Sequence, residues 1–556
     1  MAAEPEKRHD GPVQSSLEVG TTSDIPQSWY SRLLSDFRPI ERDESEGSVE
    51  APLARKLQGR HMQMIAIGGS IGTGLFIGSG ASLSQGGPLG LLLSFMIIGI
   101  MMFCVVNALG ELAVRFPISG GFNIYSTRFI DPAWGFAMGW NYALQWLVVL
   151  PLELTASALT IRYWHSTINV GVWITIFLAT VISINLIGVK GYGEAEFAFA
   201  IIKVVAVVGF ILFGIIYNVG GTPHGSYIGG KLWRDPGPLA NGFKGICAVF
   251  VNAAFAFAGT ELVGLAAAEA ANPRKSLPKA IKQVFWRITL FYIISLFIVG
   301  LIVPYTDNRL LNPSSSVDIN TSPFVIAINN AGVKILPDIF NAVILVAVLS
   351  VGNSSIYASS RTLTGLADRS QAPKIFRYVD RKGRPLVSLA LSSALGFIAY
   401  VSCSDKGPKV FTWLLALSGL SSLFTWGSIC YAHIRFRSGF AYQGYSLDEL
   451  SFKSQGGLIG SWIGLMINIL CLIAQFYTAV WPIGGTPNAK SFFEIYLAAP
   501  IILVSFIAWK IVKRTKWVSL NDMDVVSGSR AYTAEDLEEE NNTPKNGFGR
   551  VSGLLC

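Results

Sequence analysis

Three ionisable side chains, Glu153, Lys203 and Glu261, lie inside long apolar stretches of this sequence. A charge in a hydrocarbon environment is costly, so such residues are usually paired or functional. An apolar environment disfavours the charged form of a lysine, which would let Lys203 exchange a proton; the alternative is a lysine whose head group reaches the cytoplasmic surface. Glu153 could contact the amine or the side chain of a solute, or it could tether two helices by a hydrogen bond.

Glycines interrupt two apolar stretches of the sequence at corresponding places. The first interruption lies in residues 66–76 (AIGGSIGTGLF) and the second in residues 255–264 (FAFAGTELVG), and each contains a Gly-Thr pair. In lipid, non-helical backbone is tolerated only where it lines a cavity or is buried in protein. Paired breaks of this kind indicate the substrate site of a secondary transporter. The alternative is that the glycines only allow close packing of helices.

The backbone of two such breaks can bind opposite charges. N–H groups at a new half-helix start favour an anion such as a carboxylate, and C=O groups at a half-helix end favour an ammonium. The groups that we expect to bind the carboxylate belong to Gly72, Thr73 and Gly74. The carbonyls that we expect to bind the amine belong to Ser70, Phe255 and Ala258. An α-amino acid carries both charges a few ångströms apart and fits such a site.

Composition and hydropathy predict an all-α integral membrane protein. Hydrophobic residues make up 51% of the chain and charged residues 14%. That length and balance predict about twelve membrane-spanning helices. The predicted spans are 62–84, 88–113, 134–161, 168–189, 196–218, 243–268, 283–304, 335–364, 386–403, 410–434, 457–480 and 492–513.

The chain divides into three parts: a disordered N-terminal tail (1–55), a permease domain (56–516) and a C-terminal tail (517–556). Basic residues concentrate in the loops after the sixth and eighth spans, which places those loops and both termini in the cytoplasm. The net charge of +8 therefore reflects membrane topology rather than nucleic-acid binding. Six scattered cysteines form no CxxC or metal-binding spacing.

Several motifs resemble those of one transporter family. They are residues 68–76 (GGSIGTGLF), 116–122 (FPISGGF), 257–264 (FAGTELVG), 269–275 (EAANPRK), 349–354 (LSVGNS), 378–385 (YVDRKGRP) and 413–422 (WLLALSGLSS). They are similar to motifs of the amino acid–polyamine–cation superfamily, and among its members most similar to fungal amino-acid permeases of the broad-range, general type. The likeness extends from about residue 50 to about residue 520.

The resemblance implies a LeuT-like fold of two inverted five-helix repeats with broken helices 1 and 6, followed by two C-terminal helices. It implies proton-driven uptake of L-amino acids, over a broad range, at the plasma membrane. By the same resemblance, Glu261 and Lys203 are the residues expected to couple transport to protons, and Phe255 is an aromatic gate over the substrate. A third-span glutamate, here Glu153, influences recognition of basic substrates in relatives, although broad-range members carry one too.

Specificity is expected to come from small polar residues on the eighth and tenth spans. The candidates are Asn353, Ser354, Ser418, Ser421, Ser422, Thr425 and Trp426. Most of these side chains could instead hold helices together. A pocket formed by small residues and one aromatic side chain tolerates many solutes, so we expect breadth rather than narrow selectivity.

Three residues outside the spans are candidate modification sites. Lys7 is the only lysine in the first fifty residues and could accept ubiquitin, as in family members, through ubiquitin-ligase machinery. Cys556 ends the chain and could be palmitoylated, although the aromatic pair that precedes this cysteine in relatives is absent. Asn320 begins an Asn-Thr-Ser sequon in a loop predicted to lie outside the cell.

Other classes of protein fit the sequence less well. An enzyme would need a cluster of catalytic or metal-binding side chains, and the five histidines are dispersed. A nutrient-sensing permease, a narrow-specificity permease, an exchanger and a polyamine carrier stay open. The predicted partners are L-amino acids, protons and membrane lipid; no cofactor beyond the coupling proton and no nucleic acid are expected.

Overall fold

The computed structural model describes residues 36–40, 53–69, 71–118, 120–311, 322–404 and 407–529. Within these ranges the fold is helical, and its β structure consists of isolated bridges. The helices of the first half are α2 (Gly59–Gly68), α3 (Thr73–Phe76), α4 (Gly78–Arg115), α5 (Phe122–Phe129), α6 (Pro132–Thr160), η2 (Ile161–Trp164), α7 (Val170–Leu186), α8 (Val189–Asn218) and η3 (Lys231–Trp233).

The second half begins with the other broken segment. Its helices are α9 (Gly242–Phe257), α10 (Leu262–Leu265), η4 (Ala266–Glu269), α11 (Pro273–Arg287), η5 (Ile288–Ile294, a π-helix), α12 (Ser295–Ile302), α13 (Asn308–Leu311), α14 (Pro323–Asn330), α15 (Leu336–Asp368), η7 (Lys374–Arg377), α16 (Leu386–Leu395) and η8 (Gly396–Cys403). The chain continues with α17 (Gly407–Tyr442), η9 (Leu447–Glu449), α18 (Gly457–Val480), α19 (Ala489–Tyr496) and α20 (Ala498–Lys513).

The fold is that of a multi-pass membrane protein. Among the described residues, nine helical segments are long and apolar enough to cross a bilayer. A tenth is the pair α19 and α20, which is bent by 70°. Two further predicted spans coincide with α7, of 17 residues, and with the interrupted run of α2, α3 and the start of α4. The total of twelve spans stays a prediction.

Local sequence signals explain where several helices begin and turn. The first and second predicted spans join at Gly87, whose φ of +72° is readily adopted by glycine, and Pro88 follows it. Helix α6 begins after Asp131, whose carboxylate accepts the N–H of Ala133 at 2.7 Å, with Pro132 in the first helical position. These signals separate helices that would otherwise run together.

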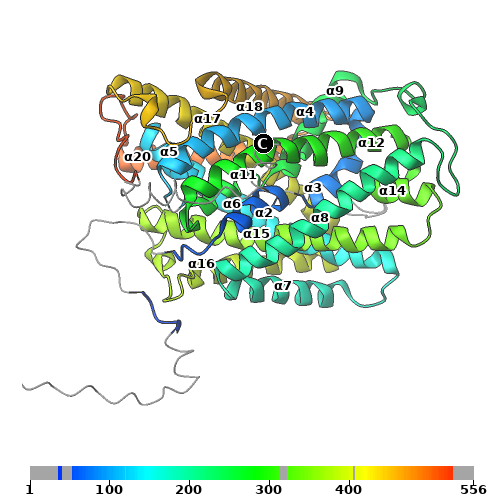
Figure 1. Cartoon of the computed structure of the whole chain (residues 1–556), viewed down its shortest axis with the longest axis horizontal. Helices are drawn as coiled ribbons and strands as arrows, with labels where there is room; N and C mark the ends of the chain where they lie inside the picture. Colours follow the sequence, from blue (N-terminus) through cyan, green and yellow to red (C-terminus); the bar gives the residue numbers. More distant parts are fainter. Residues whose placement is uncertain are drawn as a thin grey trace, which may run out of the picture.

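Packing between helices repeats in the two halves. Helix α2 packs against α8 and α11, and its counterpart α9 packs against α17 and α4, which are the counterparts of α8 and α11. The third helices of the two sets, α6 and α15, pack against each other. This exchange of partners is the pattern expected for inverted repeats. Figure 1 shows the resulting bundle, with α2 and α3 among the longer helices.

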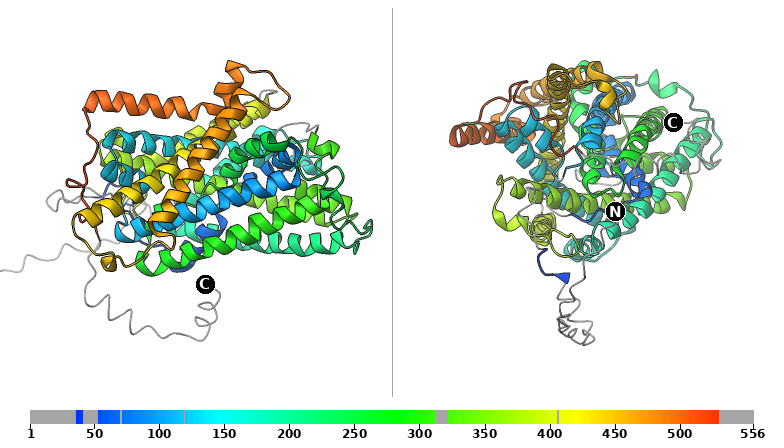
Figure 2. Two further views of the ribbon diagram at one scale, coloured as in Figure 1. Left: turned by 90° about the horizontal axis from the view of Figure 1, so that it is seen from above. Right: turned by 60° about the vertical axis from the view of Figure 1, so that its left-hand side comes forward.

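The last helices lie outside this repeated unit. Helix α18 packs on α17 and α4, while α20 packs mainly on α6. Figure 2 (left) shows α20, drawn in orange, running along the outside of the bundle.

Segments that flank the helical bundle also make contacts. Within the N-terminal tail, the N–H of Ile40 donates to the carbonyl of Val379 at 3.0 Å, and Asp36 pairs with Lys382 at 2.7 Å. Beyond α20, Met523 is buried, and its carbonyl accepts a hydrogen bond from Gln443 at 2.6 Å. Residues 517–529 therefore pack against the ends of neighbouring helices.

Candidate substrate site

The first broken segment crosses the second at very short range. Helix α2 ends at Gly68 and α3 begins at Thr73, so the backbone between them is not helical. A Cβ atom added to Gly74 would lie 2.4 Å from the Cα of Ala256 and 2.8 Å from its nitrogen. Only a glycine at position 74 lets the two backbones approach this closely. As the first residues of a half-helix, Thr73 and Gly74 have N–H groups without an acceptor inside that helix.

The second broken segment is held open by Glu261. Helix α9 ends at Phe257, and Gly259 follows with a φ of +96°. The fully buried carboxylate of Glu261 accepts hydrogen bonds from the N–H of Gly259 at 3.2 Å, the hydroxyl of Tyr142 at 3.3 Å and the indole of Trp426 at 3.3 Å. Glu261 thus fixes the break to α6 and α17.

A small cavity lies where the two breaks meet. It has a volume of ≈ 10 Å³. The residues that line it are Gly72, Thr73, Gly74, Trp146, Val149, Glu153, Phe255, Ala258 and Val351. A cavity of this volume holds about one water molecule. The structure therefore brings together the backbone groups and the aromatic side chain that the sequence singled out, with the space between them closed.

Glu153 reaches the first break directly. The hydroxyl of Thr73 donates to Oε2 of Glu153 at 2.5 Å, and both side chains are buried. The other carboxylate oxygen, Oε1, has no hydrogen-bond partner among the described residues. A buried acceptor left open at the cavity can bind a donor such as an ammonium group. Among the described residues that line the cavity, Glu153 is thus the one with an ionisable side chain.

Lys203 belongs to a second buried cluster, between α8 and α15. Its Nζ donates to Oγ of Ser350 at 2.7 Å and lies 3.5 Å from Oε1 of Glu196. The Ser350 hydroxyl in turn donates to Glu196 at 2.7 Å. The side chains of Lys203 and Glu196 are fully buried. The lysine therefore does not extend to the surface: its charge is compensated inside the protein.

The polar residues of α17 mostly connect helices. Asn141 of α6 donates to the carbonyl of Ser421 at 3.0 Å and to Thr425 at 3.1 Å. Gln145 donates to Ser422 at 2.9 Å. Ser418 is buried but does not line the cavity, and its hydroxyl has no partner in the described part of the chain.

The two polar residues of α15 are likewise engaged with neighbouring helices. Asn353 accepts a hydrogen bond from Asn185 at 2.8 Å, and Ser354 lies 3.1 Å from the hydroxyl of Tyr192.

Sequence reasoning missed the partner of Lys203. Glu196 lies seven residues before Lys203 on α8, so two helical turns place both on one face. That spacing is a signal that could have identified the pair. Ser350 gave no such signal, because it comes from a different helix.

A further buried ion pair, also missed, closes the C-terminal half of the second broken segment. The hydroxyl of Tyr357 donates to Glu269 at 2.5 Å, and Arg361 lies 3.4 Å from the same carboxylate. The carbonyl of Glu269 accepts the N–H of Leu57 at 3.0 Å, just before α2. The two broken segments are thus joined at this end by backbone as well as side-chain contacts.

Four candidate residues lie outside the described residues. They are Ser70 in the first break, Asn320 in the loop before α14, and Lys7 and Cys556 in the tails.

Fold and site together define the class: a multi-pass membrane protein built as a broken-helix transporter. A sequence model of the family described as "Amino acid permease" matches residues 61–521. The chain belongs to this amino acid permease family, a family of transporters rather than enzymes.

Named relatives cover nearly the whole chain. The protein is 55% identical over 519 residues to "General amino-acid permease GAP1" of Saccharomyces cerevisiae, which covers 90% of this chain and 86% of the relative. It is 53% identical over 531 residues to "General amino-acid permease GAP2" of Candida albicans, and this match covers 93% of this chain and 90% of the relative. It is 50% identical over 558 residues to "Cationic amino acid transporter 1" of Schizosaccharomyces pombe, and this match covers 98% of this chain and 93% of the relative.

Proposed function

We propose that the protein is a proton-coupled symporter that imports L-amino acids across the plasma membrane over a broad range. The observation that carries this proposal is the crossing of the two broken helices at Gly74 and Ala256, beside a cavity lined by Glu153. The names of the relatives support amino acids as the solutes, because the chain is similar to general amino-acid permeases along most of its length.

The two poles of an amino acid match the two sides of the cavity. In this proposal, the N–H groups of Thr73 and Gly74 bind the carboxylate. The carbonyls of Phe255 and Ala258 lie at the end of α9 and bind the amine, together with the open oxygen of Glu153. The Phe255 ring lines the same cavity and covers the bound solute.

Transport requires the closed cavity to widen. A space for about one water cannot hold an amino acid, so binding must separate the two breaks. The contacts of Leu57, Glu269 and Arg361 close one end, and release of the solute at that end requires them to part. This movement is the alternating access expected for a fold of inverted repeats.

The proton is carried, in this proposal, by the buried groups nearest the moving helices. Lys203, Ser350 and Glu196 form a compact cluster in which a proton can pass between an amine and a carboxylate. Glu261 is the second group, since its carboxylate joins the second break to α6 and α17. A change of charge at either place would alter contacts that hold the helices in one state.

Orientation and location follow from loop charge and family resemblance. Both termini lie in the cytoplasm, because the most basic loops lie on the same side as the termini. No cofactor is required beyond the coupling proton.

One observation favours a narrower function. Glu153 presents an open carboxylate oxygen to the cavity, which suits the positive side chain of lysine or arginine as well as an α-amine. A relative named as a cationic amino acid transporter has a similar sequence. The second candidate is therefore a permease that prefers cationic amino acids.

An uptake experiment separates these candidates. Radiolabelled L-leucine, L-glutamate, L-lysine and a polyamine are offered to cells that lack their own permeases, with and without a protonophore. A broad symporter takes up the three amino acids and loses uptake when the protonophore is added. Uptake of lysine alone supports the cationic permease, uptake that survives the protonophore indicates an exchanger, and uptake of the polyamine alone would contradict the proposal.

A further inference from the structure

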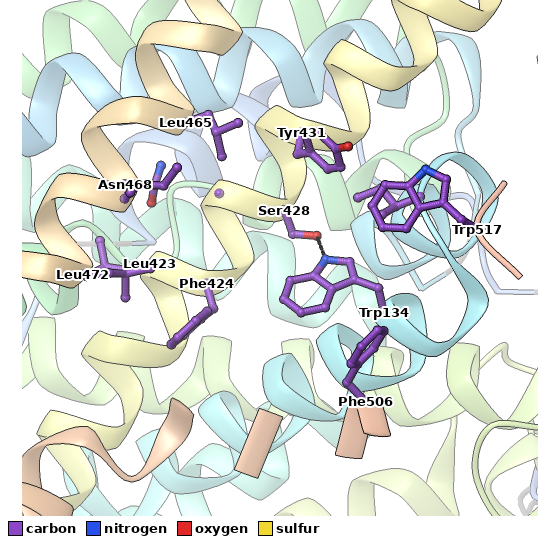
Figure 3. A pocket seen from close by; sticks show the side chains of 13 residues that line it. Trp134, Leu423, Phe424, Ser428, Tyr431, Leu465, Asn468, Leu472, Phe506 and Trp517 are labelled. Carbon is purple, nitrogen blue, oxygen red and sulfur yellow. Dashed lines mark hydrogen bonds between the residues drawn. The ribbon is translucent and has the colours of Figure 1, made fainter. Parts of the chain in front are cut away.

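An apolar groove of the bundle shares no lining residue with the candidate substrate site. Figure 3 shows the side chains that line it, most of them from α6, α17, α18 and α20. Its volume is about 360 Å³. Its lining is apolar except for a few groups, among them Ser428, which accepts the indole N–H of Trp134 at 2.9 Å. Such an opening between membrane helices must be filled, because packed protein and lipid leave few voids.

The groove opens towards the lipid-facing surface. Ile469 and Trp517, both in its lining, are 42% and 52% exposed. Along α18 the lining extends from Leu465 to Leu472, and between them Asn468 contributes a buried amide oxygen with no hydrogen-bond partner in the described part of the chain. Trp517 and Trp134 belong to the end near the termini of α20 and α6. The groove thus runs from the end of α20 towards the middle of the bilayer.

Cationic residues gather where the groove meets the end of α20. Residues 510–516 (KIVKRTK) contain Lys510, Lys513, Arg514 and Lys516 and no acidic residue. Lys510 lies 5.9 Å from the ring centre of Phe506, and Arg435 lies 5.8 Å from that of Trp517; both rings line the groove.

Some of these cations are already engaged. Lys510 pairs with the buried Asp131, and Arg435 donates to the carbonyl of Phe129 at 3.2 Å. Lys513, Arg514 and Lys516 are exposed, although Nζ of Lys513 also lies 5.5 Å from the ring centre of Trp509. Three cations thus remain accessible to a negatively charged ligand beside the mouth.

A second groove provides the comparison. It lies between α8, α14 and α15, has a volume of about 400 Å³ and is lined entirely by apolar residues and Gly209. The charges beside it, Lys334 and Asp338 at the start of α15, have opposite signs. Size alone therefore does not distinguish the two grooves; the cluster of cations does.

We propose that the groove of α6, α17, α18 and α20 binds an anionic phospholipid of the cytoplasmic leaflet. One acyl chain lies along the apolar lining, and the phosphate contacts Lys513, Arg514 and Lys516. The inner leaflet is the negatively charged one, and clusters of basic residues at the cytoplasmic end of a membrane helix bind such lipids. The proposal rests on the orientation proposed above, with α20 ending in the cytoplasm.

Glycines allow each groove to be filled without disturbing the backbone. A Cβ added to Gly427, in the lining of the first groove, would meet its nearest neighbour, Asn468, at an ordinary 3.6 Å. A Cβ added to Gly209, in the second groove, would meet nothing within 4 Å. Gly427→Leu therefore blocks the proposed site, and Gly209→Leu is its matched control.

The test is native mass spectrometry of the detergent-purified full-length protein with equal amounts of dioleoyl phosphatidylserine and phosphatidylcholine. The wild type should retain phosphatidylserine preferentially, and Gly427→Leu should lose it, whereas Gly209→Leu should not. Neutralising Lys513, Arg514 and Lys516 to Gln should weaken retention by about fivefold for each cation removed. These exposed positions lie at and just after the end of α20, so this variant keeps the test valid if Gly427→Leu fails to fold.

Three results would overturn the proposal. Equal retention of the two lipids by the wild type would mean that the cations do not select a head group. Loss of phosphatidylserine in Gly209→Leu as large as in Gly427→Leu would mean that the lipid is not bound at this groove. Dissociation of a dimer by Gly427→Leu, with no change in bound lipid, would assign the groove to a second copy of the chain. Because the readout is lipid retention, failure here leaves the amino-acid transport proposal untouched.

Discussion

Replacing Gly74 by alanine tests whether the crossing of the two broken helices is required for transport. The new methyl group would lie 2.4 Å from the Cα of Ala256 and 2.9 Å from its Cβ. Non-bonded carbon atoms approach to roughly 3.5 Å, so the backbones of α3 and α9 must separate by about 1 Å. Neither side is a flexible side-chain end that could turn away.

The size of the effect follows from this geometry. Overpacking a closely packed site typically costs about 1–3 kcal/mol, and a clash between two backbones belongs at the upper end. Transport must pass through the closed state. If Gly74→Ala raises the free energy of that state by about 3 kcal/mol, uptake should fall roughly 100-fold below that of the wild type. Uptake of radiolabelled L-leucine, normalised to protein at the cell surface, measures the loss.

Two comparisons make the result specific. Gly78→Ala lies a few residues further along, where the new methyl group meets its nearest atom, the carbonyl of Thr73, at 3.7 Å; it should transport normally. Gly72→Ala would place a methyl group 2.5 Å from Cγ2 of Val351, a side chain that can be shortened. Adding Val351→Ala to Gly72→Ala should therefore restore part of the uptake. The same second substitution should not restore Gly74→Ala. Wild-type uptake by Gly74→Ala at normal surface levels would refute the crossing.

Further predictions concern buried and surface charges and the segment after α20. Glu196→Gln leaves Lys203 without its carboxylate partner. It should reduce uptake and lower the free energy of unfolding by about 3–5 kcal/mol, which is measured as a lower melting temperature in detergent. The double variant with Lys203→Gln should be more stable than Glu196→Gln alone. Glu261→Gln replaces one carboxylate oxygen by an amide N–H₂, which faces the N–H of Gly259 and either the Tyr142 hydroxyl or the Trp426 indole, and should cost about 1–3 kcal/mol. Tyr142→Phe, which removes a single donor, should cost less in the same unfolding assay. Met523→Ala should cost about 2–5 kcal/mol if the packing of residues 517–529 is as described, and an unchanged melting temperature would contradict it. Arg309 donates hydrogen bonds to Asp307 at 2.9 and 2.7 Å and holds the pKa of that carboxyl below its usual value. The stability that the ionised Asp307 contributes is therefore present above about pH 4 and lost as the pH falls through the lowered pKa. Asp307→Asn should destabilise the protein at neutral pH and not at the acid end of a pH series.

The helices and their breaks could be predicted because their signals are local. Continuous apolar runs mark the membrane segments, and consecutive glycines mark the two interruptions. The breaks between Gly68 and Thr73 and after Phe257 lie within the predicted stretches. Glu153 could be identified as a candidate because a lone carboxylate in an apolar run stands out.

Partners across helices could not be predicted in the same way. Glu261 was expected to couple transport to protons, but the donors that its carboxylate accepts from, those of Gly259, Tyr142 and Trp426, could not be predicted. No spacing within the chain relates Glu261 to Trp426, since the two lie on different helices that packing brings together. The same holds for Lys203 and Ser350, whereas Glu196 shares a helix with Lys203 and its spacing was readable.

The closed state of the cavity was also beyond the sequence. Whether Thr73 and Glu153 leave room for a solute depends on how far two helices are separated, and the same residues must serve open and closed states. The sequence identified the cavity's lining on the two breaks, but not the distance between its walls.

Proton-coupled symport can be measured with the purified protein in liposomes. Radiolabelled L-leucine is added only to the medium outside the vesicles. A pH gradient, alkaline inside, is imposed with the membrane potential clamped at zero. Proton-coupled symport through this site predicts accumulation of leucine above the external concentration, abolished by a protonophore and reduced roughly 100-fold by Gly74→Ala. Equilibration without accumulation, or accumulation unchanged by the protonophore, would contradict proton-coupled symport through the site formed by the two broken helices.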